Sequence, residues 1–168
     1  MSSTEIYAVK QGEEPIKLGE CRNARRGAMY VWNDISQRYF GLEYFPSFDR
    51  AMQMRVWNAQ DEKPLSRSEV MVLASTMDFA TVSKNDIDQL LSSFKEYGEA
   101  HENSSISEQH DIIASSEIPE WYSIAWRQTT VSERWFEDWD DEEDTCTCDL
   151  SKAFDAAKTG QEDDEETK

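Results

Sequence analysis

The sequence predicts a small single-domain α+β protein, because strand-like segments lie near both ends of the predicted domain and helix-like segments lie between them. The chain has 168 residues, a length that suits one domain with a buried core. We expect residues 1–139 to form this compact α+β domain. Residues 140–168 are rich in charge, and we expect an acidic, largely flexible tail because such a segment buries too little apolar surface to offset its ordering entropy.

The strands are predicted from apolar residues with β propensity or alternation. Residues 6–9 form the first predicted strand, and residues 16–18 return as the second strand of a hairpin. Pro15 confines that second strand to a sheet edge or places the proline at its start, because proline cannot donate a ladder hydrogen bond. Residues 122–127 alternate between larger apolar residues and smaller or polar ones. We expect this late strand to pair with the N-terminal hairpin.

The first two helices are predicted from apolar spacing and end signals. Residues 23–39 carry apolar side chains at helical spacing, and Gly41 is the expected stop. A short helix follows Pro46, with Ser47 as its expected cap.

Three further helix starts come from serine followed three residues later by an acidic residue, the capping-box spacing. They begin at Ser66, Ser83 and Ser105. The helix after Ser83 has the most regular apolar face and is expected to end at Gly98.

Charge is distributed unevenly along the chain, whose net charge is -18. Residues 1–55 contain eight basic and seven acidic residues, whereas residues 132–168 contain four basic and fifteen acidic ones. Nucleic acid and anionic membranes repel such a protein, so neither is expected as a direct partner. A basic protein partner is attracted. Six carboxylates of the middle region are expected on the solvent faces of helices: Asp78, Asp86, Asp88, Glu96, Glu99 and Glu102.

The predicted location is the cytoplasm. The sequence has no apolar run long enough to span a bilayer and no basic-then-apolar N-terminal signal. Its three cysteines, Cys21, Cys146 and Cys148, do not form a disulfide framework.

The most distinctive segment interleaves three large aromatic residues with seven carboxylates. Proteins that bind single-stranded nucleic acid combine a basic groove with aromatic stacking platforms, and flat rings beside carboxylates suit the same groove. The alternative is that the aromatic residues complete the core and the carboxylates belong to a solvated tail. The expected partner-binding residues are Trp135, Phe136, Asp138, Trp139, Asp140, Asp141, Glu142, Glu143 and Asp144.

In size, acidity and aromatic content the chain resembles the acidic DNA-mimic inhibitors of bacteriophages. The resemblance covers the last two thirds of the chain and rests on composition, without a family motif. It implies an inhibitor of a host nucleic-acid-binding or defence protein, of the anti-restriction or anti-CRISPR type, that occupies the target's basic channel. For a phage-encoded protein the location is then the host cytoplasm.

Two other functions stay open. An acidic adaptor or regulatory subunit would bind a non-nucleic-acid protein partner through Leu150, Phe154 and Ala157. A small enzyme would use residues that meet only in the fold, for example Cys21 with His101 or His110. The basic run at residues 22–26 could contact the acidic surface of a second copy, which makes a homo-oligomer an option.

No cofactor and no metal are expected. The sequence lacks a phosphate-binding glycine loop and the common hydrolase motifs. Cys146 and Cys148 have the wrong spacing for a typical zinc site. The acidic run from Asp138 has glutamate where a calcium loop needs glycine.

Overall fold

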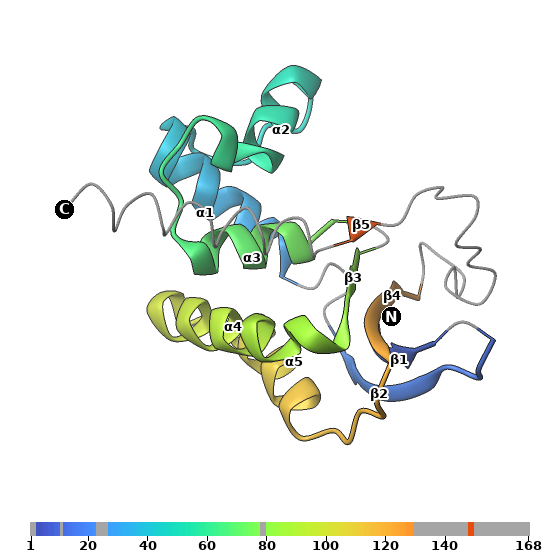
Figure 1. Ribbon diagram of the computed structural model, residues 1–168. Helices are drawn as coiled ribbons and strands as arrows, with labels where there is room; N and C mark the ends of the chain where they lie inside the picture. Colours follow the sequence, from blue (N-terminus) through green and yellow to red (C-terminus); the bar gives the residue numbers. More distant parts are fainter. Residues whose placement is uncertain (1–2, 11, 23–26, 78–79, 130–147, 150–168) are drawn as a thin grey trace.

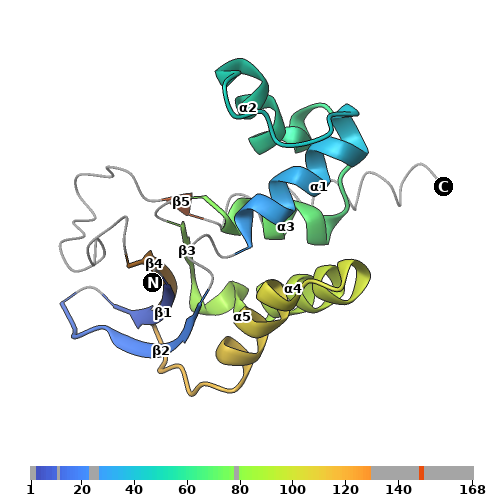
Figure 2. The same cartoon turned by 180° about the vertical axis from the view of Figure 1, so that it is seen from behind.

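The computed structural model describes residues 3–10, 12–22, 27–77, 80–129 and 148–149. In this part of the chain, five α-helices gather to one side of a mixed sheet (Figures 1 and 2). Strands come from both ends of the described chain and helices from its middle, so the predicted α+β class is confirmed. No described helix has the length and apolar character needed to cross a membrane.

The sheet has the strand order β2-β1-β4-β3-β5. Its strands are β1 (Thr4–Val9), β2 (Ile16–Cys21), β3 (Ala80–Val82), β4 (Ser123–Gln128) and β5 (Cys148–Asp149). Neighbours pair antiparallel except β3 and β5, which are parallel. The predicted pairing of the N-terminal hairpin with a late strand is confirmed, because β1 lies between β2 and β4. Strand β3 was not predicted, since three residues are too few to display an alternation.

The hairpin contains a β-bulge that brings a glycine against a helix. Ile6 pairs with Gly19 and Tyr7 with Lys17, so Leu18 is the extra residue. β2 is an edge strand, as Pro15 predicted. A Cβ added to Gly19 would lie 2.6 Å from Ile112 Cγ2, so the absence of a side chain allows α5 (Ser104–Ala114) to approach the strand.

Both predicted helices are present, but the first begins at Ala28 rather than at residue 23, and the cap of the second differs. α1 (Ala28–Phe40) ends at Gly41, whose φ of 65° is the left-handed conformation that glycine adopts readily. α2 (Arg50–Trp57) is capped by Asp49, whose carboxylate accepts the Met52 backbone N–H at 3.1 Å. The prediction of Ser47 as the cap was therefore wrong, because α2 begins at Arg50, two residues later than a cap at Ser47 requires. A short 3₁₀ turn, Ala59–Asp61, follows α2.

Helix α3 (Arg67–Ser75) starts where its capping box predicted. Ser66 Oγ accepts the Glu69 backbone N–H at 3.2 Å. A capping box implies that the Glu69 carboxylate also accepts the backbone N–H at the helix start. Glu69 does not make this hydrogen bond. It accepts hydrogen bonds from Tyr39 and Arg38 of α1 instead, so it joins two helices.

Helices α4 (Ile87–His101) and α5 form an antiparallel pair whose limits differ from the prediction. A 3₁₀ turn, Lys84–Asp86, precedes α4. Gly98 does not end α4. It is buried against Ser107 of α5, so it serves close packing, and the helix continues to His101. Asn103, not Ser105, caps α5, because its side-chain oxygen accepts the backbone N–H groups of Ser105 and Ile106.

The core lies between the sheet and the helices. Its largest fully buried side chains include Ile6, Ile35, Met71, Leu73, Leu90, Phe94, Ile106, Ile113 and Ile124. Trp126 of β4 extends into this core, and its indole N–H donates to Gln109 of α5 at 3.1 Å. This core holds α4 and α5 in fixed positions and leaves their outer surfaces to the solvent.

Candidate functional site

The aromatic-acidic segment, with all nine expected contact residues between 135 and 144, lies outside the described residues. Of the expected tail at residues 140–168, only Cys148 and Asp149 are described. The candidate site is therefore built from the folded part of the chain, beginning with its charge.

The main charged feature is the acidic hairpin, by which we mean residues 87–121: α4, α5 and the loop after α5. It contains eight carboxylates and one lysine, Lys95. All eight carboxylate residues are exposed: Asp88, Glu96, Glu99, Glu102, Glu108, Asp111, Glu117 and Glu120. The expected solvent positions of the first four are confirmed. Asp86 is only partly exposed, accepting from Ser83 Oγ at 2.9 Å, and Asp78 lies outside the described residues.

The carboxylates of the acidic hairpin lack basic partners. Within the described ranges, no lysine or arginine lies within ion-pair distance of any of the eight. Glu96 accepts a hydrogen bond from Ser68 Oγ at 2.7 Å, and Asp111 lies 3.0 Å from a ring nitrogen of His110. The hairpin thus retains most of its negative charge.

Several carboxylates outside the hairpin differ, because they pair with lysine or arginine: Glu5, Glu20, Asp34, Glu62 and Glu69. Glu5 contacts Lys17 and Arg127 across the sheet, at 3.2 and 2.9 Å. Burial alone would raise the pKa of Glu5. Hydrogen bonds from Tyr7, Arg127 and Lys17 outweigh that effect and lower the pKa to about 2. Lys17, Arg38 and Arg55 of the chain's first part pair with carboxylates outside the acidic hairpin.

Three carboxylates succeed one another at the C-terminal end of α4, two within the helix and Glu102 at its C-cap. Glu96, Glu99 and Glu102 follow one another at three-residue steps, which is ~4.5 Å of rise along a helix. Like charges at this spacing destabilise a helix slightly, and negative charge near a helix C-terminus opposes the macrodipole. The row therefore does not serve the stability of the helix.

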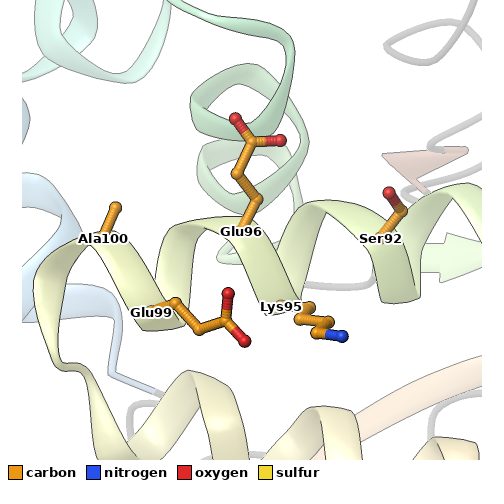
Figure 3. A pocket seen from close by; sticks show the side chains of 5 residues that line it. All are labelled: Ser92, Lys95, Glu96, Glu99 and Ala100. Carbon is orange, nitrogen blue, oxygen red and sulfur yellow. The ribbon is translucent and has the colours of Figure 1, made fainter.

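An open depression of about 550 Å³ lies along the same helix (Figure 3). Its lining side chains are Ser92, Lys95, Glu96, Glu99 and Ala100, all from α4. Glu96 projects to one side of the helix, while Lys95 and Glu99 project to the other. A hollow lined by a single helix does not enclose a small molecule as substrate pockets do. Its shape suits contact with another macromolecule.

Trp121 stands at the end of the acidic hairpin, and no sequence pattern pointed to it. Its side chain is 79% exposed, and its φ of 69° lies in the left-handed region. The backbone N–H of Tyr122 donates to the Pro119 carbonyl at 3.3 Å, which closes a turn with Trp121 at its third position. Tryptophan carries no sequence signal for this backbone conformation.

A second exposed apolar group lies at α2 and the loop before it. Tyr44 is 65% exposed, Phe48 is fully exposed, and Met54 is partly so. They lie beside a cluster of Trp32, Phe45 and Trp57 whose ring centroids are 5.0–5.5 Å apart. The cluster anchors this region to α1.

A polar cluster joins α1, α3 and α4 in the partly buried interior. Arg38 Nη2 is 2.6 Å from Asp34 and 3.5 Å from Glu69. The hydroxyl of Tyr97 donates to Asp34 at 2.8 Å, and that of Tyr39 donates to Glu69 at 2.5 Å. Sequence periodicity assigned both tyrosines to apolar helix faces and did not predict their hydrogen bonds.

The two carboxylates of the cluster share one arginine, and a tyrosine hydroxyl donates to each. Burial would raise the pKa of Asp34, but hydrogen bonds from Arg38 and Tyr97 hold it below its usual value. Burial, with the hydrogen bond to Glu69, raises the pKa of Tyr39 to about 12. Each carboxylate already accepts from an arginine and a tyrosine. No nucleophilic serine, cysteine or lysine is among these partners in the described chain, so the cluster acts as a tie between helices.

The suggested cysteine-histidine pair does not form. Cys21 is 1% exposed, and desolvation raises the pKa of its thiol to about 12. His101 instead stacks on Tyr97, with ring centroids 4.2 Å apart, and His110 contacts Asp111. In the described ranges, no group of three or more histidine, cysteine or acidic side chains is arranged to hold a metal ion.

Comparison with known proteins gives no match, whether to a protein family, to a curated protein or to a solved structure.

Proposed function

We propose that this protein is a binding inhibitor that covers the basic nucleic-acid-binding surface of a host protein by acidic mimicry. The observation that carries the proposal is the contrast in ion pairing. Glu5 and Glu20 of the sheet, Asp34 of α1 and Glu69 of α3 have arginine or lysine partners, whereas the eight exposed carboxylates of the acidic hairpin have none among the described residues. Unneutralised charge on a rigid surface attracts and orients a basic partner.

The spacing of the carboxylates supports mimicry of a nucleic acid strand. Steps of ~4.5 Å along α4 are of the same order as the ~3.4 Å axial spacing of phosphates in one DNA strand. Because α4 packs on α3 and α5, the positions from which these carboxylates project are fixed before binding. A pre-organised charged surface loses less entropy on association than a flexible one.

The target class follows from these features. A protein that binds DNA or RNA carries lysine and arginine along its channel, and such a channel accepts an ordered row of carboxylates. We propose a target of the restriction or CRISPR type, in line with the compositional resemblance. The residues from Trp135 to Asp144 remain proposed contacts that add aromatic groups and further charge.

The test is capture from a bacterial lysate at low salt with elution by a salt gradient, followed by competition with duplex DNA for the captured protein. The variant carries Glu96→Gln, Glu99→Gln and Glu102→Gln. We expect the wild type to capture a nucleic-acid-binding protein and displace its DNA, and the variant to elute at lower salt. Glutamine keeps the size of glutamate and one accepting oxygen, so the main change is the loss of charge.

The matched control removes the same charge elsewhere, through Glu13→Gln, Glu43→Gln and Asp61→Asn, three exposed residues outside the hairpin. It should behave as the wild type. Equal weakening of both variants would reduce the effect to net charge and contradict the proposal. Asn and Gln replacements over 138–144, made separately, measure the contribution of that segment.

A second candidate, an adaptor for a non-nucleic-acid protein, is favoured by the exposed apolar group at Tyr44, Phe48 and Met54. Phe48→Ala separates the two functions. Loss of the captured protein in this variant, with binding insensitive to salt, favours the adaptor. Retention of the protein favours acidic inhibition.

A further inference from the structure

Trp121 combines two properties that a folded domain normally avoids. Its indole is 79% exposed and forms no hydrogen bond or ring contact with any residue in the described part of the chain. Its backbone, at φ 69°, occupies a region that glycine enters freely and bulky residues enter under strain. The turn from Pro119 to Tyr122 has Trp121 at the position where a type II turn prefers glycine. Nothing in the packing of the described residues accounts for tryptophan here.

The loop that carries Trp121 is fixed to the fold. Ile118 packs against the hydrophobic core, and its carbonyl accepts a hydrogen bond from Lys84 Nζ at 2.8 Å. Ser116 Oγ donates to the Ile112 carbonyl at 2.6 Å. On the other side, Ser123 begins β4 in the middle of the sheet. The indole is therefore displayed from a defined position.

The surroundings of the indole specify what it can meet. Glu117 and Glu120 both precede it closely in sequence, are exposed, and have no lysine or arginine within ion-pair distance in the described chain. A partner that covers the indole must also approach these carboxylates. Lysine and arginine side chains can contact both the carboxylates and the indole, because they pair with carboxylates and stack on an indole face.

We infer that Trp121 is the apolar anchor of the acidic hairpin and inserts into an apolar cleft rimmed by lysine or arginine on a protein partner. This inference rests on the proposed function, because it names the residue of the acidic hairpin that supplies affinity. Carboxylates govern encounter and discrimination, whereas a buried aromatic side chain supplies most of the binding energy at a typical interface. The left-handed backbone at Trp121 holds the indole outward, toward the partner.

The experiment uses two synthetic peptides with equal numbers of lysines, in which lysine alternates with leucine in one and with serine in the other. Binding is followed by fluorescence anisotropy of a dye on each peptide at physiological salt. We expect the wild-type protein to bind the lysine-leucine peptide about tenfold more tightly than the lysine-serine peptide. Trp121→Gly should bind both equally, at the lower affinity. Its urea midpoint should equal or exceed that of the wild type, because glycine relieves the turn.

The matched control is Phe48→Ala, which removes another exposed aromatic side chain far from the hairpin in sequence. It should keep the preference for the lysine-leucine peptide. Retention of the preference in Trp121→Gly, or its equal loss in Phe48→Ala, would overturn the anchor. Equal binding of both peptides by the wild type would also overturn the anchor, but it would leave binding through the carboxylates in place. If the wild type binds neither peptide, the proposed function fails and the anchor fails with it.

Discussion

Glu5 receives hydrogen bonds from Tyr7, Lys17 and Arg127 on three strands of the sheet. These bonds stabilise its ionised form and account for a pKa of about 2, against 4.5 for an ordinary glutamate. A depressed folded-state pKa means that the carboxylate's stabilisation is complete above pH 4.5. It is lost as the pH falls from 4.5 toward 2.

We predict that Glu5→Gln lowers the free energy of unfolding at pH 7 by about 1–2 kcal/mol. Solvent screening of the pairs keeps this below the value that the full pKa change corresponds to. The difference from the wild type should shrink as the pH is lowered through that window. Urea unfolding at a series of pH values measures it, and a difference independent of pH would show that the ionised carboxylate is not the stabilising form.

Cys21 gives a second prediction at this scale. With a pKa of about 12, its thiolate fraction at pH 7 is on the order of 10⁻⁵. In a Cys146→Ser, Cys148→Ser variant, we expect Cys21 to react with an aromatic disulfide reagent only as fast as the protein unfolds. Saturating urea should make the reaction rapid. Fast reaction in the native state would show that the thiol is accessible.

At the scale of elements, the contact between β2 and α5 depends on Gly19. A methyl group there would meet Ile112 Cγ2 at 2.6 Å, so the helix must shift. We predict that Gly19→Ala lowers the free energy of unfolding by about 1–3 kcal/mol, as overpacking does. In an Ile112→Ala background the same change should cost less, because the clash is removed. A double-mutant cycle by urea unfolding measures this, and additivity would contradict the direct contact.

The elements also show what the sequence can predict. Helices α1, α3 and α4 and strands β1, β2 and β4 were predicted because their apolar periodicity extends over enough residues to identify them. The cap positions at Ser47 and Ser105 were wrong, since serine, aspartate and asparagine cap equally well and stand close together here. Gly98 was read as a stop, whereas tertiary contact with Ser107 explains it. The turn at Trp121 was missed because its conformation contradicts residue preference.

For the whole molecule, the uneven charge has a consequence for stability. Repulsion among the unpaired carboxylates of the acidic hairpin opposes folding, and salt screens it. We predict that sodium chloride raises the melting temperature of the wild type by about 2–5 °C. The increase should be smaller for the Glu96→Gln, Glu99→Gln, Glu102→Gln variant. Calorimetry with and without salt measures both, and a wild type whose melting temperature falls with salt would show that attractive pairs dominate.

Because β1 lies between β2 and β4, the sheet can be completed only after β4 has been synthesised. β1 leaves the ribosome before its second neighbour, β4, which is synthesised more than a hundred residues later. Until then the N-terminal hairpin has an open inner edge, and the helices are made before the sheet can close. When β4 pairs with β1, Ser3 and Thr129 also hydrogen-bond to each other through backbone and side chain. A nascent chain halted before residue 123 therefore retains an unpaired strand edge that chaperones must protect.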